Sequence, residues 1–335
     1  MQFPVLSVIV FTPVIASLLL LLMPGERKNE IRVTALAAAT LALLLSLWVY
    51  FSYDVATGGY QFMEKYDWLP ILGISYMVGV DGMNAPLVLL TGIVMFTGVL
   101  ISWGIDDRPR EFFAFLFLLA SGVFGVFVAL DLFMLFFFYE IAVFPMYLLI
   151  SIWGWVKTRE YAAMKLTLYL FIGSVVALVG ALAMYFQSGQ WTFDMLEIGK
   201  AAQAGAFNIS YNILGTQVPF QTFWFPFVFF GFAVLGGIFP FHNWSPDGHV
   251  AAPTAVSMFH AGVLMKPAIT NIGRHKISHQ LLPEHATPPE RFIIRLLAAL
   301  CIACGERRRH HPVRKRLPAA GPQVKKNSGT GNMQL

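Results

Sequence analysis

The stretch Leu132–Ile152, LFMLFFFYEIAVFPMYLLISI, decides the structural class of this protein. Its only charged residue is Glu140, and about 20 apolar helical residues are enough to cross the roughly 30 Å hydrocarbon core of a bilayer. Backbone polar groups have no partners in lipid, so such a run is helical, whereas a membrane β-barrel shows shorter segments of alternating polarity. The stretch therefore predicts an integral membrane protein.

The rest of the chain extends this prediction to a bundle. Only 12% of the residues are charged and 57% are hydrophobic, whereas soluble domains carry roughly 25% charged residues. A seventh apolar run covers Thr222–Phe241, and an eighth begins near Pro253 and stops at Lys266. The other predicted spans are Val5–Met23, Val33–Tyr53, Ala85–Gly104, Phe112–Leu130 and Leu166–Phe186. We predict an all-α fold, a polytopic transmembrane helix bundle with seven complete spans and an interrupted eighth.

The charge distribution divides the chain into two parts. Residues 1–266 hold 11 Lys and Arg against 15 Asp and Glu, whereas residues 267–335 hold 12 against 3. We therefore predict a transmembrane domain over 1–266 and a basic, disordered tail over 267–335, which has no run near 20 apolar residues. The tail's GERRRHHPVRKR is similar to a nucleic-acid-binding patch, but we expect no nucleic-acid partner for a membrane protein.

Loop charges predict the orientation. The first, third and fifth loops carry Lys and Arg residues, and the even-numbered loops carry few. By the positive-inside rule, the odd-numbered loops face the cytoplasm and the N-terminus faces outward.

Glu140 is a candidate proton carrier because it lies near the middle of its span. A carboxylate at mid-bilayer costs roughly 2.5–3.5 kcal/mol, so it should face the bundle interior or water. Pro145, in the same helix, leaves the carbonyl of Ile141 without its N–H donor. The alternative is a protonated or hydrogen-bonded glutamate with a structural role.

Two lysines and a helix break add polar groups to the apolar bundle. Lys165 opens the sixth span and could instead extend to the cytoplasmic interface, and Lys266 ends the eighth run. Gly236, Gly237 and Pro240 predict a break in the seventh helix, of the kind that transporters keep where it lines a cavity or is buried in protein.

Three histidines flank this break: His242, His249 and His260. Histidine titrates near neutral pH and can relay protons, although His242 and His249 could equally form interfacial hydrogen bonds. The spacings fit no compact metal-ligand motif, so we predict no metal site. Asp81 precedes Gly82, and this pair predicts a turn or a helix cap in preference to a functional role.

Four stretches together resemble one family: VGVDGMNAPLVLLT, FFFYEIAVFPMYLLISIWG, REYAAMKLTLYLFIGS and FPFHNWSPDGHVAAPTAVSMFHAGVLMK. They are similar to chain M (subunit 4) of the proton-pumping NADH:quinone oxidoreductase, respiratory complex I. The resemblance runs from the first residues to Lys266, in the family's order. The same antiporter-like fold is shared by subunits of cation/proton antiporters and membrane-bound hydrogenases.

The resemblance implies roles for individual residues. Glu140 would be the fifth-helix glutamate that tunes the proton site. Lys165 and Lys266 would be the lysines of the sixth and eighth helices, in a polar axis along the membrane plane. His242 would belong to the broken seventh helix.

The chain departs from the family in two ways. In many relatives a lysine lies five residues before the proline that matches Pro240, and here that position is Leu235. The usual central proton carrier is therefore missing or replaced. The family also has about fourteen helices in two inverted repeats, and only the first repeat is evident here. A frameshift or truncation after Lys266 would explain this.

We therefore predict a membrane-arm subunit of complex I that moves protons, in a bacterial plasma membrane. Its partners would be other membrane-arm subunits, including neighbouring antiporter-like subunits. FMN, iron–sulfur clusters and quinone would lie in other subunits, and this chain would hold no cofactor. The alternatives are a subunit of a multi-subunit sodium/proton antiporter or of a membrane-bound hydrogenase, and a non-functional truncated remnant.

Overall fold

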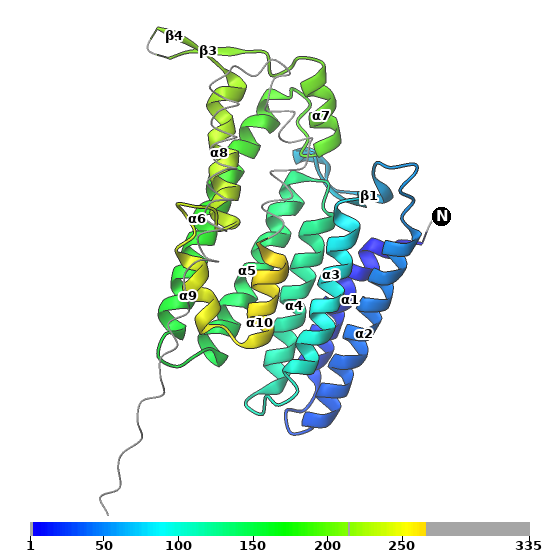
Figure 1. The fold of residues 1–335 in the computed structure, drawn as a ribbon. Coiled ribbons are helices and arrows are strands. Elements are labelled where there is room, and N and C mark those ends of the chain that lie inside the picture. The colour runs from blue at the N-terminus through cyan, green and yellow to red at the C-terminus, as the bar shows by residue number, and fades with distance from the viewer. Residues whose placement is uncertain (1–2, 214, 266–335) are drawn as a thin grey trace, which may run out of the picture. The chain divides into compact units, whose positions relative to one another are not determined.

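The computed structural model describes residues 3–213 and 215–265, and most of these residues are helical. Six helices in this part of the chain are long and apolar enough to cross a membrane, so the chain is a multi-pass integral membrane protein (Figure 1). They are α1 Val5–Leu22, α2 Lys28–Ser52, α3 Asn84–Ile101, α4 Pro109–Val128, α5 Leu132–Trp153 and α6 Arg159–Gln187. The first six predicted spans are confirmed, although α6 begins seven residues before its predicted start.

The seventh span differs from its prediction at the C-terminal end. Helix α8, Phe220–Leu235, stops before Gly236 and not at Phe241, so the predicted end is wrong. Gly237 adopts φ +62°, and the amides of Gly237 and Ile238 donate to the carbonyls of Val234 and Ala233. This is the Schellman arrangement, which satisfies the last helical carbonyls and favours glycine at the left-handed position. The predicted break at Gly236, Gly237 and Pro240 is confirmed.

Two short helices follow the break. Helix α9, Trp244–Ala251, packs on α6, and helix α10, Thr254–Phe259, packs on α3. The chain then continues as a π-helix, η2, His260–Leu264. The predicted start of the eighth run near Pro253 is therefore confirmed, whereas Lys266 and the predicted tail, 267–335, lie outside the described residues.

Helix α4 is the most buried span and packs closely on α5. A Cβ atom at Gly122 would lie 2.6 Å from the amide nitrogen of Ala142, and one at Gly125 would lie 2.2 Å from Cγ of Phe138. Small residues allow this approach, and close packing matters because lipid supplies little hydrophobic driving force between helices. These glycines therefore fix α5, the helix that carries Glu140.

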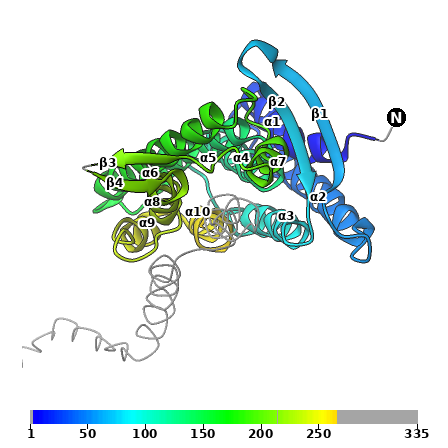
Figure 2. The same cartoon turned by 90° about the horizontal axis from the view of Figure 1, so that it is seen from above.

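Strands and a short helix cover one end of the bundle, and the sequence did not predict them. Strands β1, Gln61–Leu69, and β2, Ile74–Val80, form an antiparallel hairpin, interrupted by the 3₁₀-helix η1, Pro70–Leu72. Figure 2 shows this hairpin crossing the end of α1. The other elements at this end are α7 Met195–Gln203, β3 Ser210–Ile213 and β4 Thr216–Pro219.

Three carboxylates attach the long hairpin to the start of three helices. Glu64 of β1 accepts hydrogen bonds from the amides of Leu6 and Ser7, at the start of α1. Asp131 caps α5 by accepting from the amide of Met134, 3.1 Å away, and also accepts from the amide of Ser75 in β2.

Asp194 makes the third attachment. It caps α7 through the amide of Leu196, and its second oxygen lies 3.0 Å from the Lys65 ammonium of β1. A carboxylate at a helix N-terminus complements the helix dipole, so each contact stabilises both a helix and the hairpin.

Asp131 gives the stability of this end a pH dependence. Burial raises its pKa from 3.8 to about 6, the nearby Asp194 charge adds to this rise, and the hydrogen bonds from Ser75 and Met134 oppose it. Between about pH 4 and pH 6 the unfolded chain therefore releases this proton first, and the folded state loses stability as pH rises. Through Asp131, the wild type should lose on the order of 3 kcal/mol of folding stability between about pH 4 and pH 7. Asp131→Asn cannot titrate and should not show this loss.

Thermal unfolding of the purified chain in detergent at pH 4.5 and pH 7 measures this difference. Relative to the wild type, Asp131→Asn should gain melting temperature as pH rises. Asp67→Asn, at an exposed position of β1, serves as the control and should follow the wild type. Parallel pH profiles for Asp131→Asn and the wild type would contradict the assignment.

Candidate functional site

Glu140 contacts α6 from the middle of α5. The Ser174 hydroxyl donates a hydrogen bond to Glu140 Oε1 over 2.6 Å, and Glu140 is half-buried. The close α4–α5 packing and the Ser174 contact place the carboxyl group at the α5–α6 interface.

The Ser174 hydroxyl links Glu140 to the helix backbone. It also lies 2.9 Å from the carbonyl oxygen of Phe171, but it has only one proton to donate. An ionised Glu140 takes that proton as an acceptor. A protonated Glu140 can donate to Ser174, which then donates to Phe171. The pair can therefore accommodate both protonation states with little movement.

We infer from the packing around α6 that Leu235 lies near this pair. Phe136 of α5 stacks on Phe232 of α8, with ring centroids 6.1 Å apart. Both helices run from the hairpin end of the bundle towards the opposite end (Figure 1). One turn beyond these two rings come Glu140 and Leu235. Leu235 is also buried against Gly173, because a Cβ atom at Gly173 would lie 3.1 Å from its Cδ2.

Lys165 lies in a second polar cluster, nearer the start of α6. Its ammonium is 2.6 Å from Oδ2 of Asp247 in α9 and 5.5 Å from the ring centroid of Tyr161. The Lys165 side chain is 13% exposed, and that of Asp247 is 43% exposed. The ion pair attaches α9 to α6.

Two of the predicted histidines meet beside this ion pair. The rings of His249 and His260 stack with centroids 4.1 Å apart, and Trp244 stacks on the other side of His260 at 5.1 Å. His249 Nδ1 lies 3.1 Å from the hydroxyl of Ser257. His260 is fully buried, and neither of its ring nitrogens has a hydrogen-bond partner within the described residues.

Other predicted residues lie elsewhere. The His242 ring is tilted by 38° against that of Phe239, with centroids 5.6 Å apart, away from the His249–His260 stack, and Lys266 is outside the described residues. Asp81 accepts a hydrogen bond from the amide of Asn84 over 2.8 Å, in the turn before α3, whose N-cap residue is Met83, so its prediction as a turn residue is confirmed. Within residues 3–213 and 215–265, no three His, Cys, Asp or Glu side chains gather as a metal site would need.

The hydrogen-bond and ion-pair partners of Glu140, Lys165 and His249 were not predicted from the sequence. Asp247 is a charged residue between two histidines in an apolar region, and that signal alone could have identified it. Ser174 and Ser257 carry no comparable signal, because serine is common in membrane helices and forms hydrogen bonds to its own helix.

The family model described as NADH:quinone oxidoreductase/Mrp antiporter, transmembrane, matches residues 129–303, more than half of the chain. The chain belongs to this family. The match covers α5, α6, the broken α8 and the described parts of α9 and α10, and it runs beyond Lys266.

Relatives of the family show how much of a full-length member this chain contains. It is 40% identical over 267 residues to "NAD(P)H-quinone oxidoreductase chain 4 2" of Trichodesmium erythraeum, and 37% identical over 266 residues to "NAD(P)H-quinone oxidoreductase chain 4-2" of Synechocystis. Each match covers 79% of this chain and 45% of the relative. The chain thus spans about half the length of the curated relatives it matches.

Solved structures share the fold. A chain of respiratory complex I from Thermus thermophilus is 25% identical, with a TM-score of 0.68 over 81% of this chain and 52% of that one. A chain of the Mrp complex from Dietzia is 19% identical, with a TM-score of 0.65 over 82% and 48%, and this likeness concerns the fold alone. The antiporter-like bundle is therefore confirmed.

The neighbourhood of Leu235 yields a test. Leu235→Lys would place an ammonium beside Glu140, where an ionised carboxylate can pair with it. The variant should therefore lose less stability than Leu235→Lys combined with Glu140→Gln, which leaves the buried ammonium without a partner charge. We expect a coupling energy of about 1–3 kcal/mol between the two sites.

Melting temperatures in detergent of the wild type, both single variants and the double variant give this coupling. Glu160→Gln, at an exposed position of α6, replaces Glu140→Gln in a matched control cycle and should show no coupling. Additive effects of Leu235→Lys and Glu140→Gln would mean that the two side chains are not neighbours.

Proposed function

We propose that this chain is a proton-translocating membrane-arm subunit of an NADH:quinone oxidoreductase, with Glu140 as its proton carrier. The observation that carries the proposal is the Glu140–Ser174 contact inside the membrane, which accepts both protonation states of the carboxyl group. The names of the curated relatives support the choice of complex. Quinone reduction elsewhere in the complex would drive the transfer.

The two polar clusters mark the ends of a short path along α6. Lys165 and Ser174 are nine residues apart, which corresponds to roughly 14 Å along a helix at 1.5 Å per residue. The cluster of Lys165, Asp247, His249 and His260 would exchange protons with the cytoplasm, which its partly exposed Asp247 supports. Protons would then pass to Glu140 through bound water, because no side chain in the described residues is known to bridge this gap.

The location and partners follow from the same proposal. The chain would lie in a bacterial plasma membrane with its N-terminus outward, beside other membrane-arm subunits, including antiporter-like ones. FMN, iron–sulfur clusters and quinone would lie in other subunits. Its transmembrane domain would cover residues 1–266 and a basic tail would cover 267–335. The boundary at Lys266 stays a prediction.

A subunit of a multi-subunit sodium/proton antiporter is the second candidate. The matching family includes the Mrp antiporter, and the Mrp complex of Dietzia shares the fold. The presence of a buried acid does not distinguish the two functions. Transport driven by a sodium gradient without quinone reduction would favour the antiporter, and transport that stops with a quinone-site inhibitor favours complex I.

Glu140→Gln tests the proton role. In membrane vesicles that contain the assembled complex, it should lower NADH-driven proton pumping at least tenfold, because the amide cannot release a proton. Glu140→Asp should lower it less, since it keeps the acid. Glu160→Gln, at an exposed position, should leave pumping unchanged. Equal pumping by Glu140→Gln and the wild type, at equal assembly, would exclude the role, and no pumping by the wild type would favour a non-functional remnant.

The orientation has its own test. In a chain with Cys301 and Cys304 replaced by serine, a cysteine at Asp67 in β1 should react with an impermeant thiol reagent added outside. A cysteine at Arg108, before α4, should react only after the membrane is opened. The reverse labelling pattern would invert the proposed topology.

A further inference from the structure

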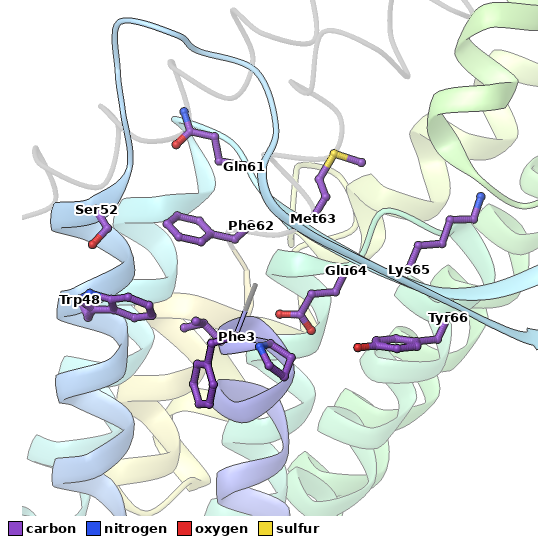
Figure 3. A pocket seen from close by; sticks show the side chains of 11 residues that line it. Phe3, Trp48, Ser52, Gln61, Phe62, Met63, Glu64, Lys65 and Tyr66 are labelled. Atoms are coloured by element: carbon purple, nitrogen blue, oxygen red, sulfur yellow. The ribbon is translucent and has the colours of Figure 1, made fainter. Parts of the chain in front are cut away.

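A pocket of about 720 Å³ lies between α1, α2 and β1. Figure 3 shows its walls: the start of α1 with Phe3, the end of α2 with Trp48 and Ser52, and the strand β1 above them with Phe62 and Glu64. The proton path proposed above does not use it, because it lies at the hairpin end of other helices.

Its depth matches that of lipid headgroups. Helix α1 begins at Val5 and α2 ends at Ser52, so both apolar helices end at the pocket. Trp48 lies one turn inside the end of α2, which is roughly 6 Å at 1.5 Å per residue. Trp48 is 47% exposed and Tyr66 of β1 is 58% exposed. Partly exposed Trp and Tyr residues at helix ends mark the membrane–water interface.

The charge in the pocket is negative. The Glu64 carboxylate is directed towards the start of α1, where it accepts from the amide of Leu6 over 2.9 Å (Figure 3). Lys65, its neighbour, is directed away from the pocket, and its ammonium pairs with Asp194 at 3.0 Å. The pair with Asp194 neutralises Lys65, so no other cationic side chain among the described residues that line the pocket faces Glu64, whose charge the start of α1 stabilises in part.

Two aromatic rings line the same pocket as this carboxylate. The rings of Trp48 and Phe62 have centroids 6.3 Å apart, tilted by 54°. Aromatic faces attract cations within about 6 Å of the ring centroid. The two oxygens of a carboxylate have about four acceptor positions. Glu64 already accepts from the amides of Leu6 and Ser7 and from the Ser7 hydroxyl, which leaves about one position for a further N–H donor. This combination is complementary to a primary ammonium group.

We propose that this pocket binds the ammonium headgroup of a phosphatidylethanolamine molecule from the adjacent leaflet. The ammonium lies beside Glu64 and the faces of Trp48 and Phe62. The acyl chains lie along the exposed apolar surface of α1 and α2. Phosphatidylglycerol is disfavoured because its headgroup has no ammonium and its phosphate charge would approach Glu64.

Native mass spectrometry of the full 335-residue chain tests the proposal. After detergent exchange removes bound lipid, the chain is titrated with dioleoyl-phosphatidylethanolamine and dioleoyl-phosphatidylglycerol in competition. We expect one phosphatidylethanolamine per chain, with at least a tenfold preference over phosphatidylglycerol. Trp48→Leu should lower this binding about tenfold, because leucine keeps an apolar surface but offers no aromatic face.

Trp155→Leu is the matched control, since Trp155 is an exposed tryptophan outside the pocket, and it should bind as the wild type does. If circular dichroism shows that Trp48→Leu does not fold, Phe62→Leu takes its place. Equal binding of both lipids, or equal binding by the folded pocket variant and the control, overturns the proposal. A photo-crosslinking residue at position 48 that captures a polypeptide instead of a lipid in native membranes also overturns it.

Discussion

The structure depends on one constraint: inside a bilayer, backbone polar groups must be satisfied within the protein, and buried charged side chains need a partner there. The break after α8 meets this constraint through the amides of Gly237 and Ile238, which satisfy helical carbonyls. The ionisable side chains meet it through neighbours on α6 and α9, since Glu140 bonds to Ser174 and Lys165 to Asp247. Because α6 contributes to both contacts, it links the two clusters and carries most of the polar chemistry inside the bundle.

Hydropathy predicted the six long spans because length and polarity decide whether a helix can remain in lipid. It placed the end of the seventh helix too late, although the glycines that end it were recognised, since Ile238, Phe239 and Phe241 are as apolar as a span requires. The hairpin was missed for a different reason. Strand β1 reads QFMEKYDWL, and its stability comes from Glu64 and Lys65 contacting residues 58 and 129 positions away, which no local pattern reveals.

The charged residues of the candidate site could be predicted from the sequence, but their partners could not. A lone acid or lysine in an apolar run is visible in the sequence, so Glu140 and Lys165 could be found. Their partners depend on which helix faces lie together, and that information is absent from the sequence. The three histidines were treated as one group, but His249 and His260 meet because the chain reverses between α9 and α10, whereas the His242 ring lies apart, against Phe239. π-helical turns often occur at functional sites, and this one carries His260.

Packing between α6 and α8 sets the surroundings of Leu235, the position where the resemblance leads us to expect a lysine. A Cβ atom at Gly173 would lie 2.9 Å from Val234, and one at Gly231 would lie 2.5 Å from Ala177, so the two helices approach closely. This approach leaves no room for solvent around Leu235, which is 1% exposed. The resemblance leads us to expect a lysine at this position, and in this chain the side chain there is apolar. The described hydrogen-bond partner of Glu140 is instead the neutral hydroxyl of Ser174 on α6.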